Sequence, residues 1–384
     1  MFEAAKLFEA LPGSIEEFQA YASLNSCAGC NICKKDCAFL EKYGTPGEIA
    51  ALYHSDPGKC LSISFACSLC GLCRAVCPKD VDAPSLFLEF RQKAFRDGKA
   101  DFPEHRRILN YEKRGASKRY SCYRLPEACD TVFFPGCTLP GTRPSVTWKT
   151  YEYLKMKIPG LGIVLDCCTK PSHDLGRKDA FEAKFLKMKT FLIGKGVRQV
   201  IVACPNCHKI FSTYGGDLSV RTVYELMAAD CVSTSAKFKG IVSVHDPCPV
   251  RFSKDVQEAV RYLLTSRGLE VWDTRRTKSR TICCGEGGSV ACVAPELAQN
   301  WTRKRVRESG HHPIATYCAG CANSLSRETA VFHILDFIFD PKRTLAGKET
   351  VYSAPMTYLN RIRLKHRIRK ENAAVTLDRK SLFY

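Results

Sequence analysis

Eight cysteines near the N-terminus fall into two runs with the same internal spacing. The runs are Cys27, Cys30, Cys33 and Cys37, then Cys67, Cys70, Cys73 and Cys77, with Pro78 after the second. In this spacing, the first three thiolates of a run bind one [4Fe-4S] cubane and the fourth binds the other cubane. The predicted ligand sets are therefore Cys27, Cys30, Cys33 and Cys77 for one cubane, and Cys37, Cys67, Cys70 and Cys73 for the other.

Zinc and disulfides are the alternatives for so many thiols. Zinc prefers two separated cysteine pairs that close one tetrahedron, and two compact runs of four fit that arrangement poorly. Disulfide frameworks are typical of small secreted chains, whereas the segment from Met1 to Ala22 has no export-signal pattern. Gly29 and Gly71 lie inside the runs, where bare backbone can approach inorganic sulfur. Cubanes are thus the favoured interpretation.

A five-cysteine pattern occurs twice further along the chain. Each copy has a single cysteine, an adjacent pair and a Cys-x-x-Cys: Cys137, Cys167, Cys168, Cys204 and Cys207, then Cys248, Cys283, Cys284, Cys318 and Cys321. An adjacent pair can bridge different irons of one cluster, but it suits a zinc tetrahedron poorly and is strained as a disulfide. Five thiolates exceed the needs of a cubane, so an unusual iron–sulfur cluster is predicted in each copy.

These motifs resemble a known family. The five-cysteine modules are similar to the CCG domain of heterodisulfide reductases, and a ferredoxin-type domain ahead of two such modules resembles the D subunit of these enzymes over residues 20–340. The resemblance implies a noncubane [4Fe-4S] cluster in each module and cleavage of a disulfide between them, with all ten module cysteines catalytic. Related chains are iron–sulfur subunits of anaerobic glycerol-3-phosphate dehydrogenase and of glycolate or lactate oxidases. One departure is Thr169, which follows Cys168 where the second module has Gly285.

Two functions are compatible with this resemblance. In the first, the chain is an oxidoreductase subunit that passes electrons from two cubane to two noncubane clusters, which reduce a disulfide substrate to thiols. In the second, it relays electrons between a flavoprotein dehydrogenase and a quinone-linked membrane cytochrome b-type subunit, without disulfide chemistry. Both need a partner subunit that donates or accepts electrons, because the sequence has no flavin fingerprint. A scaffold or zinc protein without redox activity is the least favoured class.

Composition restricts the class of protein further. The 384 residues (42.9 kDa) are 45% hydrophobic and 25% charged, which are ordinary globular values and exclude a disordered or fibrous chain. No apolar run approaches the ~18 residues of a membrane span. The formal charge of +19 ignores the thiolates among 23 cysteines, which weakens a nucleic-acid interpretation. We expect a cytoplasmic protein, or one attached peripherally to the inner face of the membrane through a partner.

From residue 131, short apolar runs alternate with helical patterns, and each run precedes a cysteine. The runs are 131–134, 162–165, 199–203, 241–244, 281–282 and 313–316. Equivalent cysteines of the two copies lie 111 to 116 positions apart, which indicates an internal duplication. Alternating strands and helices predict parallel α/β units with ligands at the carboxyl ends of the strands. The expected fold is an α+β multidomain protein, in which a small, mainly helical two-[4Fe-4S] ferredoxin-like domain precedes two pseudo-symmetric α/β lobes.

Four segments are predicted: the ferredoxin-like domain (1–120), the first CCG module (121–236), the second CCG module (237–340) and a basic C-terminal tail (341–384). Residues 82–98 are expected to form a helix and 99–120 a polar linker. Further helices are expected after caps at Asp179 and Ser253 and from Pro295. The tail carries 11 Lys and Arg against 3 Asp and Glu. Its alternation over 361–369 favours a strand or extended arm, either solvated or docked on a partner.

Other residue types in the chain could also contribute chemistry. Five cysteines match no ligand pattern, and buried structural thiols are favoured for Cys60, Cys122, Cys129, Cys231 and Cys292. Three histidines near cluster cysteines could donate a proton to a leaving thiolate, although packing or hydrogen bonding to sulfur is favoured for His173, His208 and His245. Four cations could attract an anionic substrate, with solvated surface as the default for Lys170, Arg177, Lys209 and Arg251.

Overall fold

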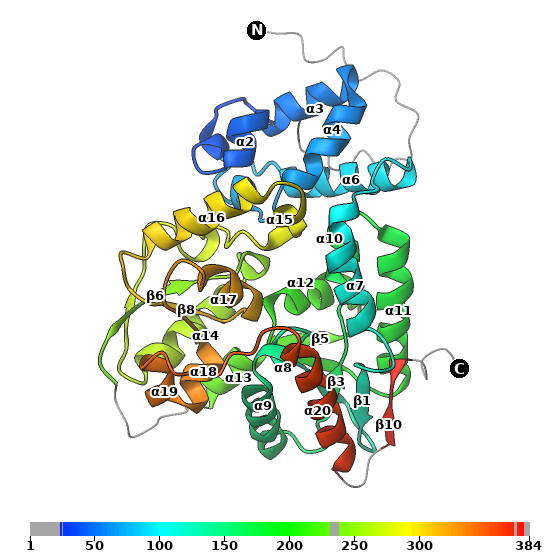
Figure 1. Cartoon of the computed structure of the whole chain (residues 1–384), viewed down its shortest axis with the longest axis vertical. Coiled ribbons are helices and arrows are strands. Elements are labelled where there is room, and N and C mark those ends of the chain that lie inside the picture. Colours follow the sequence, from blue (N-terminus) through cyan, green and yellow to red (C-terminus); the bar gives the residue numbers. More distant parts are fainter. Residues whose placement is uncertain (1–23, 25, 231–237, 372–374, 380–384) are drawn as a thin grey trace.

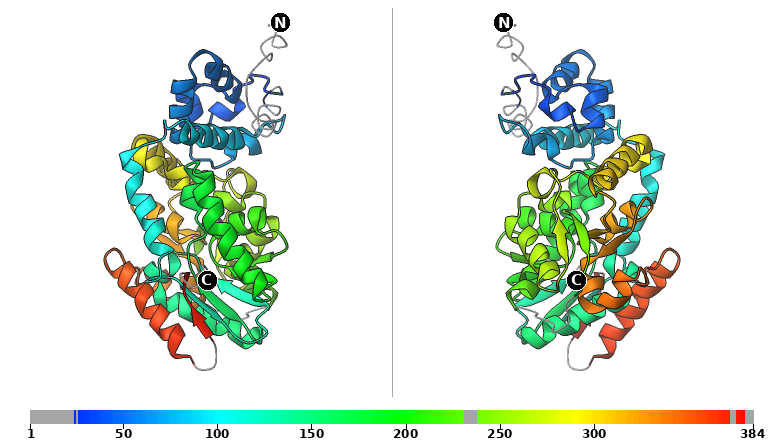
Figure 2. Two further views of the ribbon diagram at one scale, coloured as in Figure 1. Left: turned by 90° about the vertical axis from the view of Figure 1, so that its right-hand side faces the viewer. Right: turned by 90° about the vertical axis from the view of Figure 1, so that its left-hand side faces the viewer.

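The computed structural model describes residues 24, 26–230, 238–371 and 375–379 (Figure 1). A helical N-terminal part lies at one end of the molecule, and two α/β lobes lie side by side below it, as all views agree (Figure 2). The predicted fold class is confirmed. Within the described ranges, no helix is long and apolar enough to cross a membrane.

The N-terminal part consists of short helices around the eight cysteines. They are α2 (Ala38–Tyr43), α3 (Pro46–Ser55), α4 (Pro57–Ile63), α5 (Leu72–Ala75) and α6 (Ala83–Arg96). The predicted helix over 82–98 is α6, because the Asp82 side chain caps it by accepting from the Ser85 N–H at 3.3 Å. Its buried face carries Leu86, Phe90 and Ala94. This helix forms the base on which the cysteine loops rest.

The first lobe contains a six-stranded sheet in the order β10-β1-β3-β2-β4-β5. Its strands are β1 (Cys122–Leu125), β2 (Thr131–Phe134), β3 (Gly162–Leu165), β4 (Gln199–Val202), β5 (Ser219–Thr222) and β10 (Val375–Leu377). Strands β2 to β5 are parallel, whereas β1 is antiparallel to both β3 and β10. The helices of this lobe are α8 (Leu139–Thr142), α9 (Pro144–Lys157), α10 (Lys170–Asp174), α11 (Lys178–Gly194), α12 (Pro205–Tyr214) and α13 (Val223–Ala229).

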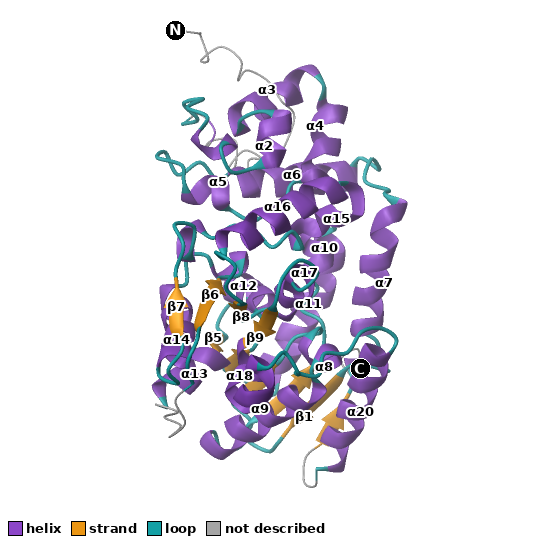
Figure 3. Cartoon of the chain, turned by 60° about the vertical axis from the view of Figure 1, so that its left-hand side comes forward, coloured by secondary structure: helices purple, strands orange, loops and turns teal. Residues whose placement is uncertain are grey.

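The second lobe repeats the parallel part of the first. Its sheet has the order β7-β6-β8-β9, which matches β3-β2-β4-β5 strand for strand. The elements are β6 (Ile241–His245), β7 (Glu270–Trp272), β8 (Ile314–Thr316), β9 (Val331–His333), α14 (Lys254–Thr265), α15 (Val290–Val293), α16 (Pro295–Glu308), α17 (Ala319–Leu325) and α18 (Ile334–Phe339). Figure 3 shows the strands of both sheets surrounded by helices. The shared topology agrees with the duplication inferred from cysteine spacing.

Five of the six predicted strands are present, and the one over 281–282 is wrong. The strand equivalent to β3 is β7, and residues 273–282 separate it from Cys283. Thr281 and Ile282 are buried, but Ile282 packs with Leu72 and Trp301 rather than in the sheet. This apolar pair is therefore explained by contact with the N-terminal part.

Two of the predicted helix starts need correction. Helix α11 begins after Arg177, and Asp179 lies in its first turn instead of capping it. Ser253 occupies the position before α14, but its side chain makes no capping hydrogen bond. Pro295 does begin α16.

The predicted linker over 99–120 is wrong in its central part, which forms α7 (Arg106–Gly115). The reason is one buried carboxylate. Glu112 is 1% exposed and accepts hydrogen bonds from the Ser172 backbone N–H and hydroxyl, both at 2.7 Å. It also pairs with Lys184 at 2.6 Å. Helix α7 is therefore fastened to the first lobe.

The strand or extended arm predicted over 361–369 is also wrong, because α20 (Met356–Lys370) includes these residues. The helix follows α19 (Pro341–Leu345) and packs on α8. Two of its basic residues are buried and donate inward: Arg361 Nη2 to the Gly115 carbonyl at 3.1 Å, and Lys365 Nζ to the Lys118 carbonyl. The alternation of basic and apolar residues along this segment therefore does not correspond to an alternation of exposed and buried side chains.

The N-terminal part shares its hydrophobic core with the lobes. Its core contains Leu175 of the first lobe and four residues of α15, α16 and the loop between them: Val290, Ala294, Leu297 and Ala298. Strand β10 joins the C-terminal segment to the first sheet. The division at residues 120, 236 and 340 stays a prediction.

Candidate functional site

The two N-terminal runs form two neighbouring thiol-lined cavities. One is lined by Cys27, Cys30, Cys33, Cys73 and Cys77. Cys33 lies near Cys27, Cys30 and Cys77, and burial raises the pKa of its thiol to about 11. Cys30 is exposed. The thiol of Cys77 therefore lies close to the thiols of the first run, as the crossed ligand set expected from the spacing requires.

The second cavity, the enclosed cavity, includes the buried thiol of Cys67. It is lined by Cys37, Cys67, Cys70 and Cys73, together with Leu72, Phe87 and Trp301 among other residues. Burial raises the pKa of the Cys67 thiol to about 12. Thiolates crowded in such a place need a bound cation to balance them. Cys73 borders both cavities, so proximity alone does not assign it.

The five cysteines of the first lobe lie at the carboxyl ends of its strands. Cys137 follows β2, Cys167 and Cys168 follow β3, and Cys204 follows β4. The side chains interact pairwise: Cys137 with Cys167, Cys168 with Cys207, and Cys204 with Cys207. Parallel strands carry their carboxyl ends to one edge, which is where open α/β sheets bind ligands.

The second lobe assembles its five cysteines in the same way. Cys248 interacts with Cys283, Cys284 interacts with Cys321, and Cys318 interacts with Cys321. Cys283, Cys284, Cys318 and Cys321 are buried. All ten module cysteines are therefore gathered into two groups, one in each lobe.

Contacts also join the groups to one another. Cys204 of the first lobe interacts with Cys318 of the second. Cys70 of the enclosed N-terminal cavity interacts with Cys283. The thiols thus form a connected series from the N-terminal part through the second lobe to the first.

Local geometry around the thiols fits iron–sulfur clusters. A Cβ placed on Gly136, which has φ +84°, would lie 3.0 Å from Cys204 Cβ and 3.4 Å from Cys207 Sγ. A Cβ on Gly287 would clash with the Ser68 carbonyl oxygen at 2.7 Å, next to Cys283 Sγ at 3.8 Å. Glycines keep this space open beside the sulfurs. None of the described cysteines forms a disulfide, so the thiols remain available as soft ligands for iron.

Thr169 adopts a backbone conformation that favours glycine. Its φ of 57° is left-handed, as is the +89° of Gly285 at the equivalent position in the second lobe. A β-branched residue rarely adopts this conformation. The Thr169 hydroxyl donates to the Cys168 carbonyl at 2.8 Å. Both loops therefore have a residue of positive φ directly after the cysteine pair.

Glu286 lies close to the thiols of both lobes. Glu286 is solvent-exposed, and its carboxylate lies within 4.8 Å of the sulfurs of Cys318 and Cys321. Burial by surrounding protein, followed by Cys284, Cys204 and Cys137, raises the pKa of Glu286 to about 8. The residue is thus exposed although protein atoms surround its carboxylate. The thiol groups of both lobes face Glu286.

Charged residues line the same region. Lys170 forms an ion pair with Asp174, and its ammonium lies near Cys168 and Cys248. Lys209 is exposed, and its pKa is lowered by burial and then by Lys170. The sequence singled out both lysines as candidates to attract an anion. It missed Glu286, although its position two residues after Cys284 was a signal.

Buried arginines were the other residues that the sequence did not reveal. Arg251 is 2% exposed rather than solvated, and its Nε donates to the Cys70 carbonyl at 3.0 Å. Arg91 is fully buried and donates to carbonyls of the N-terminal part and of both lobes. Arg305 is also fully buried. Nothing in the local sequence distinguishes these arginines from surface ones.

The remaining candidates have structural partners. His173 contacts Asp174 at 2.9 Å and Tyr214 at 2.8 Å through its two ring nitrogens. Burial lowers the pKa of His208. Three spare cysteines are buried as expected, namely Cys60, Cys122 and Cys129, whereas Cys292 is half-buried and Cys231 lies outside the described residues.

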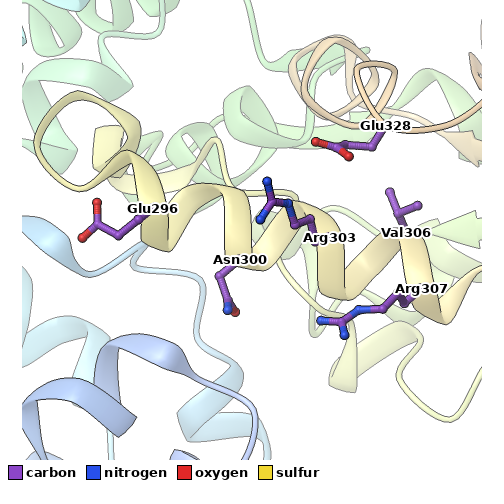
Figure 4. A pocket seen from close by; sticks show the side chains of 6 residues that line it. All are labelled: Glu296, Asn300, Arg303, Val306, Arg307 and Glu328. Atoms are coloured by element: carbon purple, nitrogen blue, oxygen red, sulfur yellow. The ribbon is translucent and has the colours of Figure 1, made fainter.

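A large pocket lies away from the thiols, on the outer side of α16 (Figure 4). It has a volume of about 510 Å³, and its lining contains no cysteine among Glu296, Asn300, Arg303, Val306, Arg307 and Glu328. The volume of a pocket therefore does not identify the cysteine sites of this molecule.

Comparisons with known proteins agree with this geometry. Residues 26–82 match the 4Fe-4S dicluster domain family, and residues 131–212 and 242–326 match the cysteine-rich domain family, CCG. The B subunit of the fumarate reductase (CoM/CoB) of Methanothermobacter marburgensis is 25% identical over 84% of this chain and 73% of its own.

Two further relatives have similar identity. The D subunit of the dihydromethanophenazine:CoB–CoM heterodisulfide reductase of Methanosarcina barkeri is 23% identical over 68% of this chain and 71% of its own. An uncharacterised iron–sulfur protein of Methanocaldococcus jannaschii is 23% identical over 81% of this chain and 68% of its own. The chain therefore has a ferredoxin-type 4Fe-4S dicluster domain followed by two cysteine-rich CCG domains.

Proposed function

We propose that this chain is the disulfide-reducing subunit of a larger redox complex, with two cubane and two noncubane [4Fe-4S] clusters. The cubane ligands would be the eight N-terminal cysteines in the crossed sets, and the noncubane ligands would be the five cysteines of each lobe. The observation that carries the proposal is the connected series of thiols, with contacts between Cys70 and Cys283 and between Cys204 and Cys318. Such a series suits electron transfer towards paired terminal sites.

The arrangement matches the electron demand of a disulfide. Reduction of RS–SR′ to RSH and R′SH breaks the S–S bond and consumes two electrons and two protons. Iron–sulfur clusters exchange electrons singly, so two adjacent sites could supply the pair. The electrons would come from a partner subunit, and the protons from the water that reaches Glu286.

The substrate would approach the thiols beside Glu286. Glu286 is reachable by solvent and faces cysteines of both lobes. Lys170 lies near Cys168 of the first lobe and Cys248 of the second. A disulfide that enters here would meet the thiol groups of both lobes together. The charged side chains of Glu286, Lys170 and Lys209 would orient the substrate, because they lie near these thiols or near one another.

Partner subunits are part of this proposal. The relatives named above are subunits of reductases, which supports a complex. The partner would be a flavoprotein, a membrane cytochrome b-type subunit or both, and it would hold the chain in the cytoplasm or at the inner face of the membrane. Exposed Cys30 beside the first cavity suits electron exchange with a protein partner.

The test uses the anaerobically purified full chain. Metal analysis should find about 16 irons per chain, since each of four clusters holds four. With reduced methyl viologen as donor and a panel of disulfides, we expect release of two thiols per disulfide consumed. The Cys283→Ser variant should lose this activity, whereas Cys129→Ser, a buried thiol outside the five-cysteine groups, should keep it.

Two results would contradict the proposal. A zinc protein without iron would exclude any redox role. An iron-loaded chain that oxidises reduced viologen but releases no thiol from any disulfide would instead support the relay between a flavoprotein and a cytochrome.

A further inference from the structure

A fully buried histidine lies beside the five-cysteine group of the second lobe. His245 is the last residue of β6 and is 0% exposed. One of its ring nitrogens lies within 4.8 Å of the sulfurs of Cys284 and Cys321. Its side chain interacts directly with Cys284. A histidine in this place could be an iron ligand, a proton donor or a hydrogen-bond donor to sulfur.

Arg305 distinguishes between these roles. Its Nε donates to His245 Nδ1 at 3.3 Å, and a guanidinium group has no acceptor. Nδ1 must therefore present its lone pair to Arg305. In a neutral imidazole the hydrogen then lies on Nε2.

Arg305 cannot readily turn away from the ring. Its Nη2 donates to the Ser243 hydroxyl at 3.0 Å and to the Val244 carbonyl at 2.8 Å. Both acceptors belong to β6, the same strand as His245. The guanidinium is fully buried, so water offers no alternative partner. The orientation of the arginine, and with it the tautomer of the histidine, is fixed by the strand.

The second ring nitrogen has no protein oxygen or nitrogen to bond. His245 Nε2 is buried and has no hydrogen-bond partner in the described part of the chain. A buried N–H without a partner is costly, and the Cys284 sulfur is the neighbour that this ring contacts. We propose that His245 donates its Nε2–H to Cys284 sulfur or to a sulfide of the bound cluster, and that it is not an iron ligand.

The alternatives conflict with the same contact. An iron ligand would need a lone pair on Nε2, which moves the hydrogen to Nδ1 and against the Arg305 donor. A proton donor needs both nitrogens protonated in one step of its cycle, with the same conflict. His245 is thus a positioning residue that acts through sulfur. This role of His245 rests on the proposed function, because it requires a cluster in the second lobe.

Donation to sulfur has a measurable consequence. A reduced cluster is more negative, so an N–H donor stabilises it and raises its reduction potential. In His245→Asn, the amide oxygen can take the place of Nδ1 and accept from Arg305, but no donor remains at Nε2. The midpoint potential of the second-lobe cluster should fall. In His245→Gln, the longer side chain carries its amide N–H to the place of Nε2, so the potential should stay closer to that of the native protein.

His333 supplies a matched control. It is also 0% exposed and ends β9, a strand of the same sheet. Its Nδ1 accepts from the Leu335 N–H at 3.2 Å, and its pKa is lowered by burial and then by Arg143, not by a cysteine. His333→Asn keeps this acceptor and should leave the cluster potential unchanged. An equal fall in both asparagine variants would mean that loss of a buried histidine alone is responsible, and would overturn the proposal.

Spectroscopy of the native chain tests the inference without any variant. The full chain is loaded with clusters, labelled with ¹⁵N-histidine, and examined by pulsed electron paramagnetic resonance after purification in H₂O or D₂O. We expect weak nitrogen coupling and an exchangeable hydrogen near the second-lobe cluster. The hydrogen signal should be lost in His245→Asn and kept in His245→Gln. Strong coupling, as expected for coordinated imidazole, would overturn the proposal.

The possible failures are distinguishable. If iron analysis and the spectra show no cluster in the second lobe, the proposed function fails first and this inference falls with it. If the cluster is present and disulfides are reduced, but nitrogen coupling is strong or the exchangeable hydrogen is absent, only the role of His245 is wrong.

Discussion

Two buried arginines connect the N-terminal part to the lobes at the level of single residues. Arg91 donates to the carbonyls of Ser64, Asp174 and Gly288 at 2.6 to 3.1 Å and also to that of Cys67. Arg251 donates to the Cys70, Ser279 and Thr281 carbonyls at 3.0, 2.6 and 2.8 Å. Each guanidinium donates to carbonyls from several segments that are far apart in the sequence. These contacts hold the enclosed thiol cavity against the second lobe.

Replacement of Arg251 by Met should therefore destabilise the protein strongly. The buried Thr281 carbonyl and two half-buried carbonyls would lose their donor. An unsatisfied buried group costs about 1–3 kcal/mol, so we expect the free energy of unfolding to fall by about 1–3 kcal/mol. Anaerobic urea unfolding of the cluster-loaded chain measures this. Arg303→Met, at an exposed arginine, is the control and should change stability by less than about 0.5 kcal/mol. Similar losses in both variants would contradict the role assigned to Arg251.

For single residues, the sequence predicted the roles that follow from residue type. It did not predict the roles that follow from the position of a residue in the folded chain. The cysteines could be recognised because their spacing is set by the sulfur sites that they reach. Arg251 and Arg305 could not, since an arginine in sequence looks the same whether solvated or buried. Burial of a guanidinium depends on carbonyls supplied by distant segments, as with Cys70 and Arg251.

At the level of elements, periodicity predicted most strands but misassigned α20. Basic and apolar residues alternate from Arg361 to Arg369, which suggests a period of two. The helix instead buries Asn360, Arg361, Leu364, Lys365 and Ile368, a face with helical spacing. Arg361 and Lys365 bury their stems and donate to backbone carbonyls, as long cationic side chains can. The pattern of hydrophobic residues in the sequence cannot by itself show that such basic residues are buried.

Substitutions on the two faces of α20 should differ in effect. Leu364 is 4% exposed and belongs to the main core, so Leu364→Ala should cost about 2–5 kcal/mol. Arg363 is exposed, and Arg363→Ala should change the free energy of unfolding by less than about 0.5 kcal/mol. Anaerobic urea titrations of both variants would measure the difference. Equal costs would be expected of a solvated arm and would contradict the packed helix.

At the level of the whole molecule, the duplication was predictable but the way its parts interlock was not. Cysteine intervals indicated two equivalent lobes, and both sheets have the same strand order in their parallel parts. The sequence placed the N-terminal part in a separate domain, whereas its core includes Val290, Leu297 and other lobe residues. Interlocking depends on contacts between segments that are far apart in the sequence. It also brings Cys70 to Cys283.

That contact predicts an order of electron transfer through the molecule. The enclosed N-terminal thiols meet the second lobe through Cys70 and Cys283, and the second lobe meets the first through Cys318 and Cys204. Electrons from a donor should therefore reach the second-lobe site before the first-lobe site. Cys283→Ser should abolish reduction at both five-cysteine sites, because a hard oxygen is a poor substitute for thiolate. Cys137→Ser should leave the second-lobe site reducible.

Freeze-quench electron paramagnetic resonance, after mixing with a limiting amount of reduced donor, measures which sites receive electrons. Cubane signals must persist in both variants, since Cys283 and Cys137 lie outside the N-terminal runs. If Cys283→Ser still reduces the first-lobe site at the native rate, electrons enter that lobe by another route, and the contact between Cys70 and Cys283 is only structural. If Cys137→Ser instead blocks the second lobe, the order is reversed. Because the two variants differ only in the lobe that they disable, their comparison assigns a direction to a molecule that is otherwise nearly symmetric in its lobes.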